Sequence, residues 1–120
     1  MVEVCNNLPM EKDMLYFLKV SGTIRIGKHQ EFQQTVQFIF NQLPTQCVKR
    51  ELAIDVHNTY HYYVSTLWQS EETLAAFKAS NIFDLLKGAF QTLGRFDESM
   101  EGSGLSIQTF DVRYHESNRV

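Results

Sequence analysis

The sequence predicts an α+β domain in which helices cover one face of a four-stranded antiparallel sheet. Three observations lead to this fold class. Four segments have the alternation, or the β-branched and aromatic composition, of strands, and apolar residues recur at helical spacing between them. The resulting order is strand, helix, strand, strand, helix, helix, strand, and the first strand, residues 14–22, is apolar on both sides. This order corresponds to the split βαβ, or ferredoxin-like, arrangement.

Length and composition fit one globular domain. The chain has 120 residues, of which 43% are hydrophobic, and 11 basic against 14 acidic residues give a net charge of −3. This composition excludes wholesale disorder, and the negative charge argues against nucleic acid or an anionic membrane as the main partner. The N-terminus lacks the basic and apolar regions of a signal peptide, and no apolar run approaches the roughly 20 residues of a membrane helix. We therefore expect a cytoplasmic protein, with secretion by an unusual route left open.

The N-terminal part predicts a tail, a strand and a helix. Residues 1–13 are polar and aperiodic, which indicates a tail before the strand at 14–22. A helix is expected over residues 28–43, because its apolar residues share one stripe and Pro44 cannot continue the hydrogen-bond ladder. The stripe consists of Phe32, Val36, Ile39, Phe40 and Leu43.

The central part predicts a β-hairpin followed by two helices. Residues 47–55 and 60–68 are the two strands, and residues 57–59 form the turn between them. Ser70 is suited to cap one helix, and a second helical piece starts at Asn81. Gly94 is suited to the left-handed C′ position just past this helix. After it we expect a polar loop at 95–104, a last strand at 105–114 and a tail at 115–120, so that the domain spans 14–114.

The first strand also predicts a homodimer. Met14, Tyr16, Leu18 and Val20 share one face of that strand, and Leu15 and Phe17 lie on the other. Helices on one side of the sheet can cover only one of these sets. The simplest partner for the other set is the same sheet of a second copy.

The motifs of common catalytic and metal sites are absent from the sequence. His57 and His61 are spaced four apart on a predicted turn and strand, where they lie too far apart for one metal ion. Cys47 stands near Lys49 and Arg50 without a visible partner acid or histidine, so we interpret it as a passive thiol. The sequence also lacks a nucleophile elbow, a dinucleotide fingerprint and a phosphate-binding loop. We therefore expect no metal ion and no disulfide.

Aromatic residues are the most informative part of the composition. The chain has nine Phe, five Tyr and one Trp. Trp68 ends a predicted strand just before the helices that carry Phe77, Phe83 and Phe90. These residues either close an aromatic core or line a cavity for a flat organic ligand between sheet and helices.

Three stretches resemble a known family. They are residues 24–32, residues 47–52 and residues 68–74, the last followed by Phe77, Ser80 and Phe83. In this order and spacing the chain resembles the antibiotic biosynthesis monooxygenase-like family of dimeric α+β barrels, over about residues 14–114. The resemblance implies a small oxygenase that attacks electron-rich phenols or quinols without metal, flavin or haem.

The chain departs from that family at several positions. Phe77 stands where many members have a histidine, and Arg50 stands where the second strand often carries a tyrosine. The family's haem-degrading branch uses an Asn, a Trp and a haem-ligating His, which by spacing correspond to Val20, Phe77 and Lys87. Val20 cannot hydrogen-bond an oxygen ligand, and a protonated lysine is a poor iron ligand, so we expect no haem degradation.

The resulting hypothesis is a monooxygenase-like protein that acts on a small aromatic or quinol-type compound. The candidate base is His61, the candidate cation for a substrate anion is Arg50, and the candidate pocket wall consists of Val20, Trp68, Phe77 and Phe83. His61 and Trp68 differ by seven positions, so a regular strand places them on opposite faces. The competing hypothesis is a dimeric barrel without catalysis, which binds a small molecule or has a structural role. An open pocket with a polar group favours the enzyme, and a closed aromatic core favours the structural protein.

Overall fold

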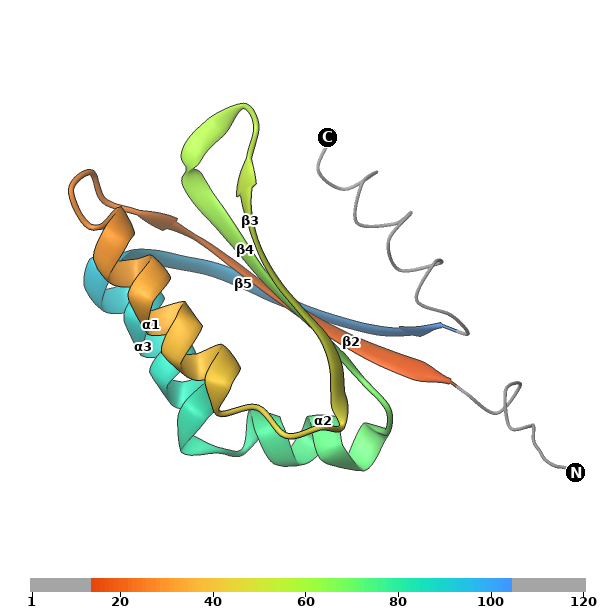
Figure 1. The fold of residues 1–120 in the computed structure, drawn as a ribbon. Helices are drawn as coiled ribbons and strands as arrows, with labels where there is room; N and C mark the ends of the chain where they lie inside the picture. Colours follow the sequence, from red (N-terminus) through yellow and green to blue (C-terminus); the bar gives the residue numbers. More distant parts are fainter. Residues whose placement is uncertain (1–13, 105–120) are drawn as a thin grey trace, which may run out of the picture.

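The computed structural model describes residues 14–104 of the chain. The tails predicted at 1–13 and 115–120 and the strand predicted at 105–114 lie outside this range, so the domain boundary at residue 114 stays a prediction. The elements, in chain order, are β2 (Leu15–Ile24), α1 (His29–Asn41), β3 (Cys47–Asp55), β4 (Asn58–Trp68), α2 (Glu71–Lys78), α3 (Asn81–Leu93) and β5 (Gly94–Gly104), as Figure 1 shows.

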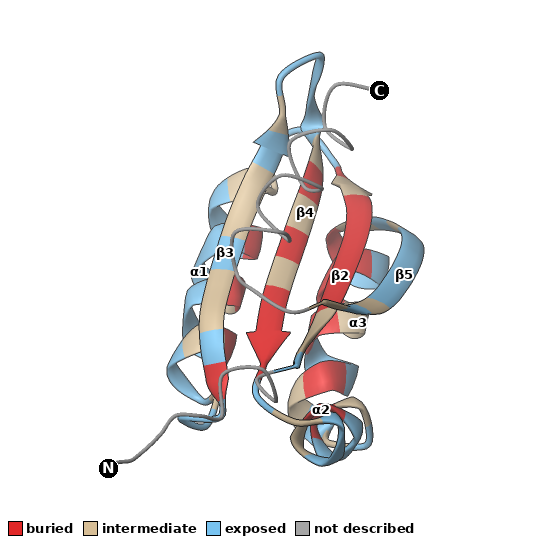
Figure 2. Cartoon of the chain, turned by 90° about the vertical axis from the view of Figure 1, so that its right-hand side faces the viewer, coloured by how far each residue is buried: buried red, intermediate tan, exposed pale blue. Residues whose placement is uncertain are grey.

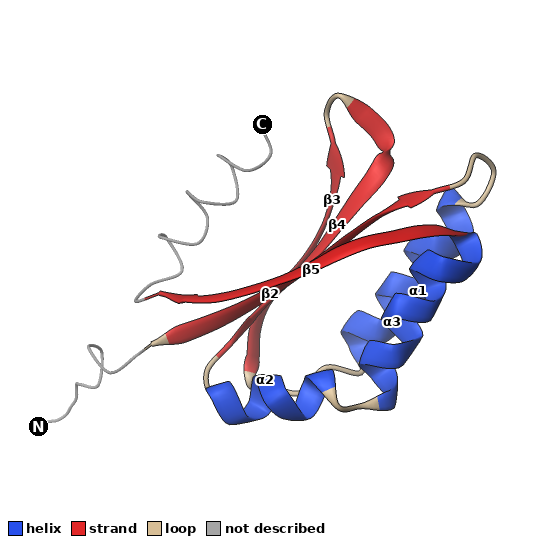
Figure 3. Cartoon of the chain, turned by 180° about the vertical axis from the view of Figure 1, so that it is seen from behind, coloured by secondary structure: helices blue, strands red, loops and turns tan. Residues whose placement is uncertain are grey.

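The four strands form one antiparallel sheet in the order β3-β4-β2-β5. The helices of the described chain all lie against the same face of this sheet, as seen from behind in Figure 3. This arrangement confirms the predicted α+β, ferredoxin-like fold class. We call the covered side the helix face and the other side the second face.

The register between the central strands fixes which side chains point to the helices. Tyr16 lies opposite Trp68 and Val20 opposite Val64, and the pairing continues without a bulge to Thr23. Because directly opposed residues share a face, the even-numbered residues of β2 and β4 point toward the helices. They meet the stripes of α1 and α3 in a core whose largest members are Trp68, Tyr62, Phe32, Phe90, Leu18, Ile24 and Ile39. Of the two apolar sets on β2, the set of Tyr16, Leu18 and Val20 is therefore the one under the helices.

Local signals explain where the helices begin. The Ser70 side chain accepts a hydrogen bond from the backbone N–H of Thr73 at 3.1 Å, so Ser70 is the predicted cap of α2. Ser80 caps α3 in the same way through the N–H of Phe83.

Among residues 14–104, no helix combines the length and apolar character that crossing a membrane requires.

The C-terminal part of the described chain corrects two expectations. Residues 95–104 are not a loop, because they form β5 and pair with β2 from Leu15 to Ile24. Gly94 is also not a left-handed helix end, since its φ of 179° is extended and the strand starts there. A Cβ at this position would collide with the carbonyl oxygen of Thr23, so close backbone approach explains the glycine. β5 escaped prediction because this edge strand is mostly exposed and carries polar residues.

Candidate functional site

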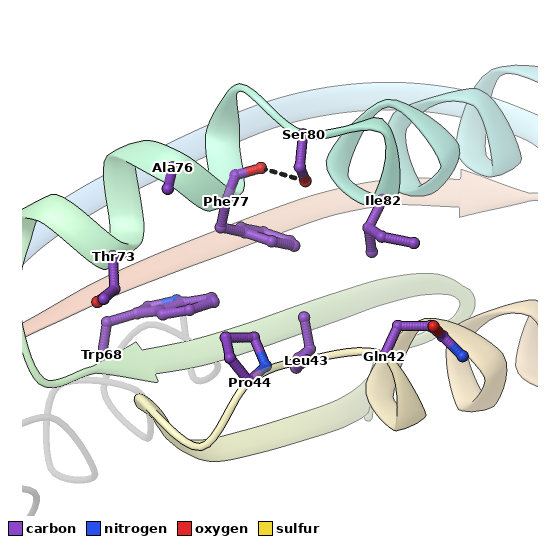
Figure 4. Close-up of a pocket in the computed structure, with 9 residues that line it drawn as sticks. All are labelled: Gln42, Leu43, Pro44, Trp68, Thr73, Ala76, Phe77, Ser80 and Ile82. Carbon is purple, nitrogen blue, oxygen red and sulfur yellow. Dashed lines mark hydrogen bonds between the residues drawn. The ribbon is translucent and has the colours of Figure 1, made fainter.

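A pocket of about 260 Å³ opens between α2, the start of α3 and the segment that joins α1 to β3 (Figure 4). Trp68, at the end of β4, forms its floor on the sheet side. The lining residues are Gln42, Leu43, Pro44, Trp68, Thr73, Ala76, Phe77, Ser80 and Ile82. We call this space the Trp68 pocket. Its lining is mostly apolar, which suits a small organic ligand.

Two aromatic rings make the inner wall of the pocket. Trp68 is completely buried, and its indole stacks on Phe77 with ring centroids 5.0 Å apart and planes inclined by 30°. The ring of Phe83 lies 5.3 Å from that of Phe77. In Figure 4 the Trp68 ring comes from β4 and the Phe77 ring faces it from α2.

Helical periodicity brings the α2 side of the pocket together. Thr73, Ala76 and Phe77 are spaced at three and four residues, which places them on one face of α2, and Ser80 follows in the short turn between α2 and α3. The Thr73 hydroxyl donates to the carbonyl oxygen of Ser70 at 3.0 Å, and the Ser80 hydroxyl donates to that of Phe77 at 2.6 Å. These two hydroxyl protons are therefore already used within the protein.

The rim of the pocket carries one polar side chain, Gln42, whose amide is available to a ligand. Gln42 follows the last turn of α1 and is exposed, and its side-chain amide has no hydrogen-bond partner within residues 14–104. An amide offers both donors and an acceptor. A ligand in the pocket would thus find at its rim one group able to bind a hydroxyl or carbonyl oxygen.

Arg50 does not line the pocket, but its side chain binds the backbone beside the rim. Its Nη1 donates to the carbonyl oxygen of Phe40 at 2.5 Å, and its Nη2 donates to that of Cys47 at 3.0 Å. These two carbonyls stand on either side of the segment that contains Gln42, Leu43 and Pro44. The guanidinium therefore ties the end of α1 to the start of β3, and its role as a cation for a substrate anion stays a prediction.

The other predicted wall residues lie in the adjoining core. Val20 projects from β2 on the helix face and is 1% exposed, and Phe83 packs beside Phe77 from α3. Neither is among the lining residues of the Trp68 pocket. Lys87 lies on α3 with its Nζ 4.8 Å from the centre of the Phe83 ring. All four candidate wall residues thus belong to one core cluster, and of these Trp68 and Phe77 line the pocket.

His61 lies on the second face, away from the pocket. Its Nδ1 is 3.3 Å from a carboxylate oxygen of Asp97 and 3.5 Å from the Thr23 hydroxyl. The unbroken register between β2 and β4 leaves no bulge that would turn His61 toward Trp68. His61 and Arg50 therefore belong to different surfaces of the sheet, and the role of His61 as a base stays a prediction.

The remaining reactive groups do not gather into a site. Burial raises the pKa of the Cys47 thiol, and Arg50 only partly opposes this effect, so the thiol stays protonated near neutral pH. Within the described range, no three His, Cys, Asp or Glu side chains come close enough to hold a metal ion.

Sequence reasoning missed most of the lining, including Gln42, Pro44, Ala76 and Ile82. The spacing on α2 was a usable signal, because it places Thr73 and Ala76 beside Phe77. The rim could not be found in this way, since it depends on how the segment after α1 folds back toward α2.

Comparison with family models and with curated proteins finds no match for this chain. Several solved structures do match its fold. A conserved protein from Methanosarcina mazei has a TM-score of 0.66 and 13% identity, over 81% of this chain and 97% of its own. A Chloroflexus aurantiacus protein provisionally named an antibiotic biosynthesis monooxygenase has a TM-score of 0.62 and 16% identity, over 77% of this chain and 94% of its own.

A third match is a mutant of SnoaB, a cofactor-independent oxygenase from Streptomyces nogalater. Its TM-score is 0.57 with 19% identity, over 80% of this chain and 95% of its own. At these identities the likeness concerns the fold. The chain has the fold of antibiotic biosynthesis monooxygenase-like proteins, as the sequence resemblance implied.

Proposed function

We propose that this protein binds a small aromatic compound of the phenol or quinol type in the Trp68 pocket and oxygenates it with O₂, without a metal or flavin. The observation that carries the proposal is an open aromatic pocket with an uncommitted amide, Gln42, at its rim. The fold is shared with a protein named a cofactor-independent oxygenase, which supports the same function.

The chemistry needs little from the protein. In an anthrone-type substrate, an acidic CH₂ loses a proton and the carbanion supplies electrons to O₂. One oxygen atom becomes the new carbonyl, and the other leaves as water with the two hydrogens of the CH₂. The apolar wall of Trp68 and Phe77 excludes water, and the Gln42 amide can hold the developing oxyanion. Arg50 as cation is a part of this scheme that only variants can test. His61 lies on the second face of the sheet, so the scheme does not use it as the base for a substrate in this pocket.

We also propose a homodimer that forms through the second face. Leu15 and Met100 lie on that face, Met100 is 40% exposed, and within residues 14–104 no helix covers it. Two such sheets packed face to face would bury these side chains. Sedimentation should give about twice the mass of one chain, and a uniform monomer at micromolar concentration would refute the dimer. The cytoplasmic location stays a prediction from sequence, which fractionation of the source cells tests.

One observation favours a second candidate, a dimeric protein that binds the same compounds without catalysis. None of the residues lining the Trp68 pocket has an acidic or basic side chain. A substrate would then have to lose its proton without help from these nine residues. This candidate predicts ligand binding without O₂ consumption.

Oxygen uptake separates the two candidates. The substrates are anthrone and a panel of hydroquinones, and the proteins are the native chain, Ala76→Phe and Ala75→Phe. Both alanines are exposed on α2, but only Ala76 lines the pocket, so its phenyl group should fill it. Uptake above the protein-free rate should be kept by Ala75→Phe and lost in Ala76→Phe. Uptake at the protein-free rate with every compound would overturn the oxygenase, and equal uptake by both variants would overturn the site.

A further inference from the structure

A short hydrogen-bond chain connects the pocket wall to the centre of the sheet. The indole Nε1–H of Trp68 donates to the Thr66 hydroxyl at 2.8 Å, and this hydroxyl donates to the carbonyl oxygen of Leu18 at 3.3 Å. Trp68 and Thr66 lie two residues apart on β4, on the helix face, and Leu18 is opposite Thr66 on β2. Thr66 is 5% exposed and Trp68 is completely buried. The hydroxyl is thus the acceptor for a polar group that has no access to water.

This bond sets the direction of the indole. Side chains in a sheet usually stand roughly perpendicular to it. To reach Thr66, the Trp68 ring leans back along β4, and one of its faces is then turned toward α2. Figure 4 shows the ring lying along the strand below Phe77, consistent with the small angle of 30° between the two planes.

The threonine side chain is suited to this task. Its β-branch restricts χ1, and its single proton is committed to Leu18, so a lone pair is left for the indole N–H. Without the hydroxyl, a buried N–H would lack an acceptor, which is costly enough to turn the ring toward another partner.

We propose that Thr66 is a positioning residue for the Trp68 pocket, holding the indole in the orientation that makes a flat wall for an aromatic ligand. This inference rests on the proposed function, because it assigns a purpose to the wall. Thr66 does not line the pocket, so it acts on the ligand only through Trp68.

The experiment compares Thr66→Val, which keeps the shape and removes the hydroxyl, with Thr66→Ser, which keeps the hydroxyl. Thr59→Val is the control on the exposed end of the same strand. Trp68 is the single tryptophan of the chain, so fluorescence and the near-UV circular dichroism of the indole report on this ring alone. Affinity is measured by calorimetry with 1-naphthol under nitrogen.

We expect Thr66→Val to bind 1-naphthol about tenfold more weakly than the native chain, which corresponds to about 1.4 kcal/mol. Its indole dichroism and emission maximum should both change. Thr66→Ser should bind within about twofold of the native chain and keep both spectra, because it restores the acceptor. Native affinity and native spectra in Thr66→Val would overturn the inference.

Two further results keep the test decisive. If the native chain does not bind 1-naphthol, the proposed function fails in its binding step, and the spectra of Thr66→Val alone decide whether Thr66 positions the ring. If Thr66→Val does not fold, the native indole N–H resonance gives the answer. We expect it to be protected from hydrogen exchange, and exchange as fast as that of a free indole would overturn the inference.

Discussion

The two faces of the sheet differ in how their residues are used. On the helix face, side chains from β2 and β4 join those of the helices in one continuous apolar core. On the second face, toward the viewer in Figure 2, apolar residues such as Phe17 and Leu67 alternate with Lys19, Ser21 and His61. The helix face therefore has the composition of a domain interior. The second face has a mixed apolar and polar composition, and it is the face that the proposed dimer would use.

The helix face itself has a packed part, which stabilises the fold, and an open part, which is the proposed binding site. Most of the face is filled, from Ile24 and Phe90 at one end to Leu74 at the other. The Trp68 pocket leaves space at this end, where α2 and α3 meet the segment after α1. The pocket is thus a local gap at the end of a packed layer. Its inner wall, Trp68 and Phe77, belongs to the core, whereas Gln42 and Ala76 are exposed and can be changed without altering the core.

The largest expected effect comes from the filled part of the helix face. Phe90→Ala should lower the free energy of unfolding by about 3–5 kcal/mol, because Phe90 is completely buried and its ring centroid lies 4.7 Å from that of Phe32. Phe38→Ala on α1, where the ring is 52% exposed, should change it by no more than about 0.5 kcal/mol. Urea unfolding measures both. Similar losses in the two variants would mean that the helix layer is not packed as described.

A charge on the second face tests the contrast between the two faces directly. Phe17→Glu should weaken the proposed dimer at least about a hundredfold, or about 2.7 kcal/mol, because it would bury a carboxylate between the two sheets. Phe38→Glu, which adds the same charge to the outside of α1, should leave the dimer intact. Sedimentation over a dilution series measures the effect, and far-UV dichroism checks that Phe17→Glu is folded. A folded Phe17→Glu that dimerises like the native chain would place the interface elsewhere.

A smaller effect is expected at the rim of the pocket. Arg50→Ala should cost about 1.5–3 kcal/mol of unfolding free energy, because the carbonyls of Phe40 and Cys47 lose charged donors. Arg50→Lys should recover part of this loss, since an ammonium group can serve one carbonyl. Arg25→Ala, which removes an exposed arginine, is the control. Unchanged stability in Arg50→Ala, together with weaker binding of phenolates, would instead support the role of Arg50 as a cation for the ligand.

The smallest effect concerns pH. Burial raises the pKa of the Cys47 thiol, so the folded chain keeps this proton where the unfolded chain has lost it. The stability is therefore complete below the ordinary thiol pKa of about 8.5 and falls as the pH rises through the raised value. Unfolding at a series of pH values should show a steeper decline for the native chain than for Cys47→Ala. Parallel curves would contradict a buried, protonated thiol.

The fold was predictable where the sequence pattern coincided with burial. The stripe of α1 and the cap at Ser70 are local signals that tertiary packing did not override. β5 was missed because its residues are mostly exposed along an edge, where little burial imposes an alternation. Its strand character comes from pairing with β2, a long-range contact that no local pattern in residues 95–104 encodes.

The site was predictable only in part. The contact between Trp68 and Phe77 followed from the order of strand and helix, and the opposite orientations of Trp68 and His61 followed from strand parity. The engagement of Arg50 with two backbone carbonyls could not be foreseen. It depends on how the segment after α1 folds back toward β3. Only this folding brings the carbonyl oxygens of Phe40 and Cys47 within reach of the Arg50 side chain.

The central claim is that the Trp68 pocket receives a small aromatic compound, and binding of 1-naphthol tests it most directly. Calorimetry under nitrogen compares the native chain with Ala76→Phe, which fills the pocket, and Ala75→Phe, which does not. The account predicts one ligand per native chain, the same affinity in Ala75→Phe, and affinity at least about tenfold weaker in Ala76→Phe. Equal binding by all three proteins, or binding by none, would contradict it.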